Sequence, residues 1–434
     1  EKAQRTYGST LNHRYARASG FILDTQAGWF QTTEDKDKWK LAYKVAADGS
    51  SAPDKRTLEP ESKSDRTWTA SSAAALPLRA LLWQELKFGA SFRARGRVRD
   101  KDRFEVSPAG AVKFTGESKD RYRLQEDYSA AFLQDRLRLT EKLSVTPGVR
   151  FERVRLLTAS SGGPAAPRYF NDLNPSAHLL YRVARNWSLR AAVSRGLARP
   201  KFDELAPYEN VSSTKIVIGN PDLNPARAWN YDAGFDYATR LATFSVNGFR
   251  KTIRGVIEEV DTGLDRDGRD VFRVENAGDG WTSGIEFEQR FRMPSTAPRW
   301  ARIFSFWSNQ TLLVSNLKAA NGQQRPFKEQ PRWIANLGAD VSDERFGTSV
   351  SLMCNLLSRR YDYKPNGDVS SFAGSSSLDL AVYQRIRGNW RLFLEGNNLA
   401  NRQRVLDENF LNGTMNRRTE VFGRTVLAGV QVSF

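Results

Sequence analysis

Hydrophobic and polar residues alternate along most of the chain with a period of two. Between Trp229 and Tyr237, five aromatic or apolar residues alternate with Asn, Asp and Gly. Because successive side chains of a β-strand point to opposite faces, this segment has one apolar and one polar face. The pattern therefore predicts an all-β protein. It recurs in five further segments: 143–152, 187–194, 285–291, 378–383 and 425–434.

The alternating segments are longer than ordinary strands. Many continue for roughly ten to sixteen residues, whereas strands of globular proteins average about five or six. A tilted strand that crosses a membrane needs about 9–11 residues. The polar faces are also rich in charge, as expected for a water-filled lumen. A soluble sandwich, which is the main alternative for strands with one wet face, explains neither feature.

Short and long connections follow each other in turn. This alternation is typical of an up-and-down outer-membrane barrel with periplasmic turns and extracellular loops. We count about seventeen strands. The sequence thus predicts one domain, residues 1–434, forming an antiparallel transmembrane β-barrel of about 17–22 strands with a periplasmic C-terminus. The short connections are 15–20, 77–81, 139–143, 184–187, 238–242, 293–299, 341–347 and 386–390. The long ones are 34–63, in which 39–45 is a candidate small hairpin, and 99–121, 156–168, 201–227, 258–280, 315–330, 361–375 and 402–424.

Composition excludes or disfavours several other classes of protein. The 434 residues carry a formal charge of +17, a mean hydropathy of −0.57, one Cys and two His. No run approaches the ~18 apolar residues of a membrane helix. The single Cys354 excludes an internal disulfide framework. Lys and Arg are scattered rather than gathered in a stripe, which disfavours nucleic acid and favours a basic surface facing lipid phosphate or an anionic solute.

Several motifs, taken in order, resemble the TonB-dependent receptors of Gram-negative outer membranes. They begin with Leu-Asn-Pro-Ser at 173–176 and span residues 173–434, well over half of the chain. Each is weak alone, and the order makes the resemblance specific. The motifs are Ser-Arg-Gly-Leu-Ala-Arg-Pro-Lys-Phe at 194–202, Gly-Asn-Pro-Asp-Leu-Asn-Pro at 219–225, Trp-Asn-Tyr-Asp at 229–232, Gly-Ile-Glu at 284–286, Asn-Asn-Leu-Ala-Asn at 397–401 and the terminal Phe434.

The resemblance implies a 22-stranded barrel that is closed by an N-terminal plug domain. It also implies energised uptake of a scarce nutrient, such as a ferric siderophore, a vitamin or a glycan, with TonB coupled through the plug. No plug-like segment or TonB-coupling box is present near Glu1. We therefore expect the C-terminal part of such a receptor, with the plug and about five strands preceding it. The alternative is a plugless barrel that acts as a passive pore or as a structural component of an outer-membrane assembly.

Three residues at loop bases are candidate ligand contacts: Arg195, Arg199 and Asp222. The competing interpretation is structural, because Pro200 ends strand pairing and Asn220-Pro221-Asp222 fits an Asx-type turn. The net charge suggests an anionic small molecule as ligand, and lipid or lipopolysaccharide as a second partner.

Catalytic, metal and cofactor sites are not expected. A hydrolase would need His178 and a serine to be steadied by a third group. The acidic segment 261–270 lacks the bidentate Glu of a calcium loop.

Aromatic residues near strand ends are the expected membrane-interface positions. An amphipathic ring settles at the depth of lipid headgroups, and transmembrane barrels carry such girdles at both interfaces. We assign this role to Trp229, Tyr231, Trp390 and Phe434.

Overall fold

The computed structural model describes residues 2–46, 48–79, 82–116, 120–160, 167–212, 215–266, 268–319 and 322–432. Within these ranges the chain forms one sheet of 22 strands, a second sheet of four strands and one helix of four residues. Phe434 lies outside the described residues.

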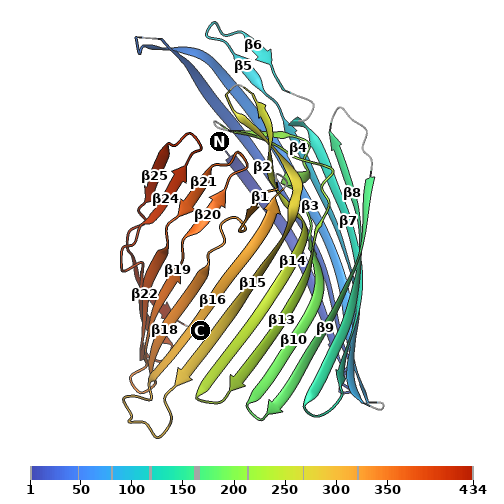
Figure 1. Cartoon of the computed structure of the whole chain (residues 1–434), viewed down its shortest axis with the longest axis vertical. Coiled ribbons are helices and arrows are strands. Elements are labelled where there is room, and N and C mark those ends of the chain that lie inside the picture. Colours follow the sequence, from blue (N-terminus) through green and yellow to red (C-terminus); the bar gives the residue numbers. More distant parts are fainter. Residues whose placement is uncertain are drawn as a thin grey trace.

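Seventeen strands of the large sheet make the wall of a barrel (Figure 1). Each wall strand pairs antiparallel with the next in sequence, and β1 and β26 each pair with one wall neighbour among the described residues. The predicted strand number and the up-and-down order are confirmed. The wall strands are β1 (Lys2–Ala16), β2 (Ile22–Val45), β3 (Ser51–Arg79), β4 (Trp83–Lys101), β7 (Tyr122–Arg138), β8 (Leu143–Ser160), β9 (Pro167–Ala184), β10 (Trp187–Ala198), β13 (Ala226–Ala238), β14 (Ala242–Asp265), β15 (Asp270–Arg292), β16 (Phe304–Ala319), β18 (Trp333–Asp343), β19 (Thr348–Leu357), β22 (Ser375–Arg387), β23 (Trp390–Asn397) and β26 (Thr425–Val432).

The two rims of the barrel differ in their connections. Short connections join β1 to β2, β9 to β10 and β22 to β23 at the short-turn rim, the lower edge in Figure 1. Long connections gather at the opposite, long-loop rim. Val432 pairs with Trp390, which directly follows the short turn between β22 and β23. Lys2 pairs with Lys36, at the end of the β1–β2 ladder that is far from the short turn between these strands. The two ends of the described chain therefore lie at opposite rims.

Two segments expected as loops are continuous β-ribbons. β2 and β3 stay paired up to Val45 and Ser51, and β14 and β15 stay paired up to Asp265 and Asp270. The predicted loops 34–63 and 258–280 are wrong in this respect. Backbone ladder bonds do not depend on apolar side chains, so a strand continues into solvent after its alternation has ended. The connection between β15 and β16 is also longer than predicted, at 293–303.

The remaining long loops contain short elements of their own. Helix α1 (Phe202–Leu205) begins the loop between β10 and β13. Two strands from each of the last two long loops form the second sheet. The short strands are β5 (Phe104–Val106), β6 (Val112–Phe114), β11 (Glu209–Val211), β12 (Lys215–Ile218) and β17 (Gln324–Arg325) in the large sheet, and β20 (Arg360–Tyr363), β21 (Val369–Phe372), β24 (Arg404–Asn409) and β25 (Met415–Glu420) in the second.

The apolar core lies at the mouth of the barrel rather than within the wall. The loop between β10 and β13 folds inward, and its Phe202, Leu205 and Leu223 become almost fully buried. They pack with Leu124 of β7 and Leu156 of β8, which are also buried. Burial of such a side chain contributes roughly 1.5–3 kcal/mol, so this cluster fixes the loop inside the mouth.

Contacts with inward-folded loops identify the lumen face of β4 and of β15. Asp203 of the loop binds Arg97 of β4, and Gln330 donates to Thr282 of β15. The alternate positions on the opposite face are apolar and exposed, as at Ile285 (44%) and Leu312 (50%). The barrel is therefore polar inside and apolar outside, as the alternation predicted.

The described residues form the wall and its loops, and none of them makes a separate plug-like α/β domain. Among these residues, no helix has the length and apolar character needed to cross a membrane.

Candidate functional site

Five cations project from alternate positions on the lumen face of β4: Arg93, Arg95, Arg97, Arg99 and Lys101. We call them the β4 cation ladder. Carboxylates of neighbouring strands pair with most of them. Arg93 binds Glu126 at 2.8 Å, Arg97 binds Asp65 at 2.6 Å, Arg99 binds Glu61 at 2.7 Å and Lys101 binds Glu59 at 3.0 Å.

The ladder also holds the inward-folded loop. A second carboxylate, Asp203 of α1, binds Arg97 at 2.7 Å. The guanidinium of Arg95 lies 4.4 Å from the ring centre of Phe202, and that of Arg99 lies 4.2 Å from the ring of Tyr208. Cation–π contacts of this kind contribute about 0.5–2 kcal/mol each. Wall and loop are thus connected by charge as well as by apolar packing.

A cavity of about 660 Å³ lies between this loop and the ribbon of β2, β3 and β4. We call it the mouth cavity. Eight of its lining residues are Lys or Arg, and four are Glu. Lys36 and Lys38 of β2 line this cavity. In the strand register they are paired with Glu61 and Glu59 of β3. A lining with twice as many cations as carboxylates focuses a positive potential, which concentrates anionic solutes.

Glu59 is the most enclosed carboxylate of the mouth cavity. It lies twenty residues before the short turn after Arg79, well beyond the ~9–11 residues that a membrane-spanning strand needs. Lys40 at 2.7 Å and Lys101 at 3.0 Å donate to its two oxygens. Burial pushes its pKa upward, but the hydrogen bonds and charges of the two lysines outweigh burial and lower the pKa to about 2.

Arg195 and Arg199 meet at one buried carboxylate. Asp172 of β9 is almost fully buried and accepts a hydrogen bond from Arg227 at 2.8 Å. Arg195 and Arg199 lie 4.0 and 3.9 Å from it, and Arg199 also binds Glu152 at 2.7 Å. The pairing of β10 with β9 ends at Ser194. Beyond that point, Arg195 and Arg199 connect the two strands through Asp172 of β9.

The third predicted contact, Asp222, does not join this cluster. Its backbone N–H donates to the side chain of Asn220 at 2.9 Å, the bond of an Asx turn. The Asp222 side chain itself is exposed. A ligand-contact role for Arg195, Arg199 and Asp222 stays a prediction.

The aromatic residues assigned to the interface are exposed on the wall. Trp229 and Tyr231 lie on the outer face of β13 toward the long-loop rim, 40% and 47% exposed. Trp390 is 54% exposed and begins β23 at the short-turn rim. Phe434 lies outside the described residues. The interface role itself stays a prediction.

Sequence reasoning missed the β4 cation ladder. The signal was present, because Arg or Lys occupies every second position from Arg93 to Lys101. This is the same period of two that identified the apolar faces. The inward-folded loop left no comparable signal. Within the described residues, no group of three or more His, Cys, Asp or Glu is arranged to hold a metal ion.

Comparison with known proteins agrees with this architecture. A family model described as TonB dependent receptor-like, beta-barrel matches residues 1–399. The hemoglobin-haptoglobin utilization protein B of Neisseria meningitidis serogroup C is 24% identical over 272 residues, which cover 55% of this chain and 33% of that protein. The iron-regulated outer membrane virulence protein of Vibrio cholerae is 24% identical over 254 residues, which cover 56% of this chain and 35% of that protein.

A solved structure shows the same fold over the whole chain. The ferric-catecholate import receptor Fiu of Escherichia coli K12 superposes with a TM-score of 0.71 at 14% identity, covering 100% of this chain and 64% of that one. The matches with the two relatives above cover about one third of each relative's length. The family match, the up-and-down antiparallel wall of seventeen strands and this superposition agree with the resemblance seen in the motifs. The chain therefore belongs to the TonB-dependent receptors, a family of non-enzymatic outer-membrane transporters, and forms their β-barrel.

Proposed function

We propose that the protein containing this barrel takes up an anionic, iron-bearing small molecule across the outer membrane, driven by TonB. The observation that carries the proposal is the mouth cavity, with eight cations and four carboxylates in its lining. A cavity of about 660 Å³ lies within the 300–1,000 Å³ range of small-molecule sites. Six of its cations come from β2, β3 and β4, and the other two are Arg103 after β4 and Arg269 between β14 and β15. The inward-folded loop adds lining residues 208–211, so wall and loops together can surround a ligand.

The names of similar proteins support iron as the cargo. One relative is named for the utilization of hemoglobin-haptoglobin and another as iron-regulated, and a protein of the same fold imports a ferric catecholate. Ferric catecholates are anionic and match the charge of the mouth cavity. A protein ligand such as hemoglobin would also meet the mouth, but the enclosed cations suit a compact anion better.

The proposal places the long-loop rim at the cell surface and the C-terminus in the periplasm. In this orientation the mouth cavity opens to the medium, and the lumen leads toward the cell. Arg195 and Arg199 then act as anchors of the loop after β10, because the buried Asp172 and the partly buried Glu152 already bind them. TonB coupling requires a plug, which the family supplies from sequence outside the described barrel.

Growth under iron restriction tests the proposal. The complete gene product is expressed in a host that lacks its own ferric-chelate receptors. An anionic ferric tris-catecholate or a neutral ferric trihydroxamate is then supplied as the iron source. We expect growth on the anionic chelate only, and only when the host has TonB. Growth that persists without TonB would favour the passive pore, and no growth on any chelate would favour a structural role.

The mouth cavity is tested by removing two of its lysines. In the K36Q/K38Q variant we expect the Kd for the ferric tris-catecholate to rise about fivefold to tenfold at low salt. The difference should shrink as salt screens the charges. Lys44→Gln is the matched control, because Lys44 lies on the same strand, pairs with Asp54 and does not line the cavity. Equal affinities of wild type and K36Q/K38Q would contradict a role for this cavity.

A further inference from the structure

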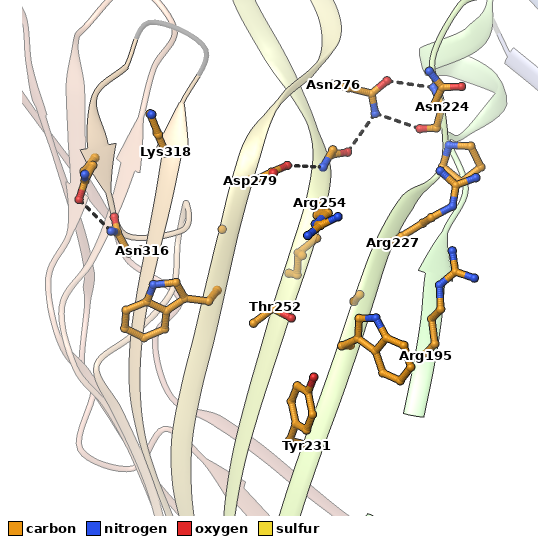
Figure 2. Close-up of a pocket in the computed structure, with 18 residues that line it drawn as sticks. Arg195, Asn224, Arg227, Tyr231, Thr252, Arg254, Asn276, Asp279, Asn316 and Lys318 are labelled. Atoms are coloured by element: carbon orange, nitrogen blue, oxygen red, sulfur yellow. Dashed lines mark hydrogen bonds between the residues drawn. The ribbon is translucent and has the colours of Figure 1, made fainter. Parts of the chain in front are cut away.

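A groove of about 1010 Å³ lies across β13–β16 just below the long-loop rim (Figure 2). We call it the wall groove. Strand alternation places it on the outside of the barrel. Thr282 and Ser315 face the lumen, where they bond Gln330 and Phe327 of an inward-folded loop. The groove residue Trp281, which is adjacent to Thr282, therefore faces outward.

The outer face changes character in three steps along this part of the wall. Apolar residues such as Ile285 and Leu312 come first, on the short-turn side, and are 44% and 50% exposed. Trp229 and Trp281 follow, aligned through Thr252 in the strand register. Cations come last. Figure 2 shows Arg227, Arg254 and Lys318 above Thr252 and Tyr231 in the groove.

Two of the four cations of the wall groove have no carboxylate partner in the described part of the chain. Its lining contains Arg195, Arg227, Arg254 and Lys318, against the single carboxylate of Asp279. Arg195 and Arg227 share the buried Asp172 described above. Asp279 accepts the backbone N–H of Gly255 at 2.9 Å. In the part of the chain that the structure describes, no side-chain hydrogen bond or ion pair engages Arg254 or Lys318.

We propose that the wall groove binds the phosphorylated sugar headgroup of a glycolipid of the outer leaflet, with the acyl chains on the apolar band below. This site goes beyond the uptake of a nutrient, because it lies on the opposite side of the wall from the lumen.

The arrangement suits a phosphate ester at membrane depth. Arg227 and Arg254 are direct neighbours in the register, so their backbones lie about 5 Å apart. Two guanidinium groups at this spacing can hold one phosphate through charge-assisted hydrogen bonds. Lys318 lies two strands from Arg254, roughly 10 Å away, within reach of a second phosphate on the same headgroup.

Trp229 and Trp281 set the depth in the membrane at which the headgroup would lie. Indole rings settle between the apolar and the wet part of a bilayer. Arg250 lies 4.5 Å from the ring centre of Trp281 and holds the ring against the wall. A lipid fits better than a free anion, because the cations stand directly above a band that acyl chains would cover, on a surface that faces the membrane.

Binding by purified protein tests the proposal. The complete gene product is extracted in detergent and freed of lipid, and binding of bisphosphorylated lipid A is measured by native mass spectrometry. The comparison probes are the same lipid without phosphate and inorganic phosphate alone. We expect the dephosphorylated lipid to bind about tenfold or more weakly, and inorganic phosphate not to displace bound lipid A at equimolar concentration.

Substitutions assign the binding to the groove. R254Q/K318Q should weaken lipid A binding about tenfold or more. Lys251→Gln should leave it unchanged, because Lys251 is on the same strand but pairs with Asn230 and Thr282 on the lumen face. Heat-modifiable gel mobility reports folding. If the double variant does not fold, the single variants R254Q and K318Q carry the test, each with a loss of about threefold.

Three results would overturn the proposal. The first is wild-type lipid A binding by R254Q/K318Q. The second is equal binding of phosphorylated and dephosphorylated lipid, which would indicate an apolar surface only. The third is displacement of lipid A by equimolar inorganic phosphate, which would indicate a simple anion site.

Discussion

Buried carboxylates organise the charged residues of this barrel. Asp172 and Glu59 are each at least nine-tenths buried, and each has two or three cations around it. Removing one partner of such a cluster leaves the other charges buried without a counter-charge. The resulting loss of folding stability is larger than the stability that an exposed ion pair contributes. The stability of the mouth therefore depends on few residues.

Asp172→Asn should release the loop that follows β10. The change removes the charge shared by Arg195, Arg199 and Arg227 and weakens the attachment of the loop by about 3 kcal/mol. We expect trypsin to cleave at Lys201 and Lys215 at least tenfold faster than in the wild type. Asp222→Asn is the control, since Asp222 is exposed on the same loop. Equal cleavage rates in the wild type and D172N would show that the carboxylate does not anchor the loop.

Glu59 should make the β2–β3 ribbon sensitive to acid. Its folded pKa of about 2 lies below the ordinary value of 4.5. Ionised Glu59 therefore stabilises the ribbon above about pH 4.5, and the contribution of up to about 3 kcal/mol is lost as the pH falls from 4.5 toward 2. Hydrogen exchange over residues 55–61, corrected for intrinsic rates, should increase across this window. In Glu59→Gln the increase should be absent, and an identical pH profile would contradict the assignment.

At the scale of elements, the loop between β10 and β13 depends on one close contact. A Cβ on Gly219 would lie 1.9 Å from the backbone oxygen of Ala206, directly after α1. The neighbouring bond from Asn220 N to the oxygen of Glu204, 2.7 Å long, ties the same two segments together. No side-chain rotation relieves a clash with backbone, so the two segments must separate when Gly219 is replaced.

Gly219→Ala should therefore loosen the loop without unfolding the wall. Overpacking of this kind costs about 1–3 kcal/mol. We expect amide exchange of residues 204–220 to rise about tenfold, while exchange in β13 and β14 stays constant. Gly248→Ala serves as control, because the nearest atom to its Cβ is 3.9 Å away. Unchanged exchange at 204–220 would refute the close packing.

The sequence predicted strands well in the part of the wall that has an apolar outer face and a polar inner face. The wall strands follow from alternation, since each residue there is either outside and apolar or inside and polar. The ribbon beyond residue 34 was missed, because its charged residues lie on both faces and leave no period to detect. The loop around α1 was missed because its apolar residues bury against Leu124 and Leu156, which are distant in sequence.

Site prediction from sequence succeeded less well than fold prediction. The ligand-contact role of Arg195 and Arg199 stays a prediction, and one sequence could not show that both lie beside Asp172. The charged residues of the mouth cavity come from three wall strands and three connections, and the strand register and the folding of these connections bring them together. The net charge of +17 gave the correct sign of the mouth cavity but not its place.

At the scale of the whole molecule, the proposals on uptake and on lipid depend on the same orientation. The mouth cavity receives a ligand from the medium only if the long-loop rim is at the cell surface. The wall groove meets the outer leaflet only in the same case. The orientation is therefore the central claim, and it predicts which turns an impermeant reagent can reach.

Cysteine labelling of intact cells measures the orientation directly. In a Cys354→Ser background, Asn412→Cys lies between β24 and β25 at the long-loop rim, and Asn389→Cys lies between β22 and β23 at the short-turn rim. Both positions are exposed, so permeabilised cells should label both. With a membrane-impermeant maleimide on intact cells, we expect labelling at residue 412 and none at residue 389. Labelling at 389 with protection of 412 would contradict the account.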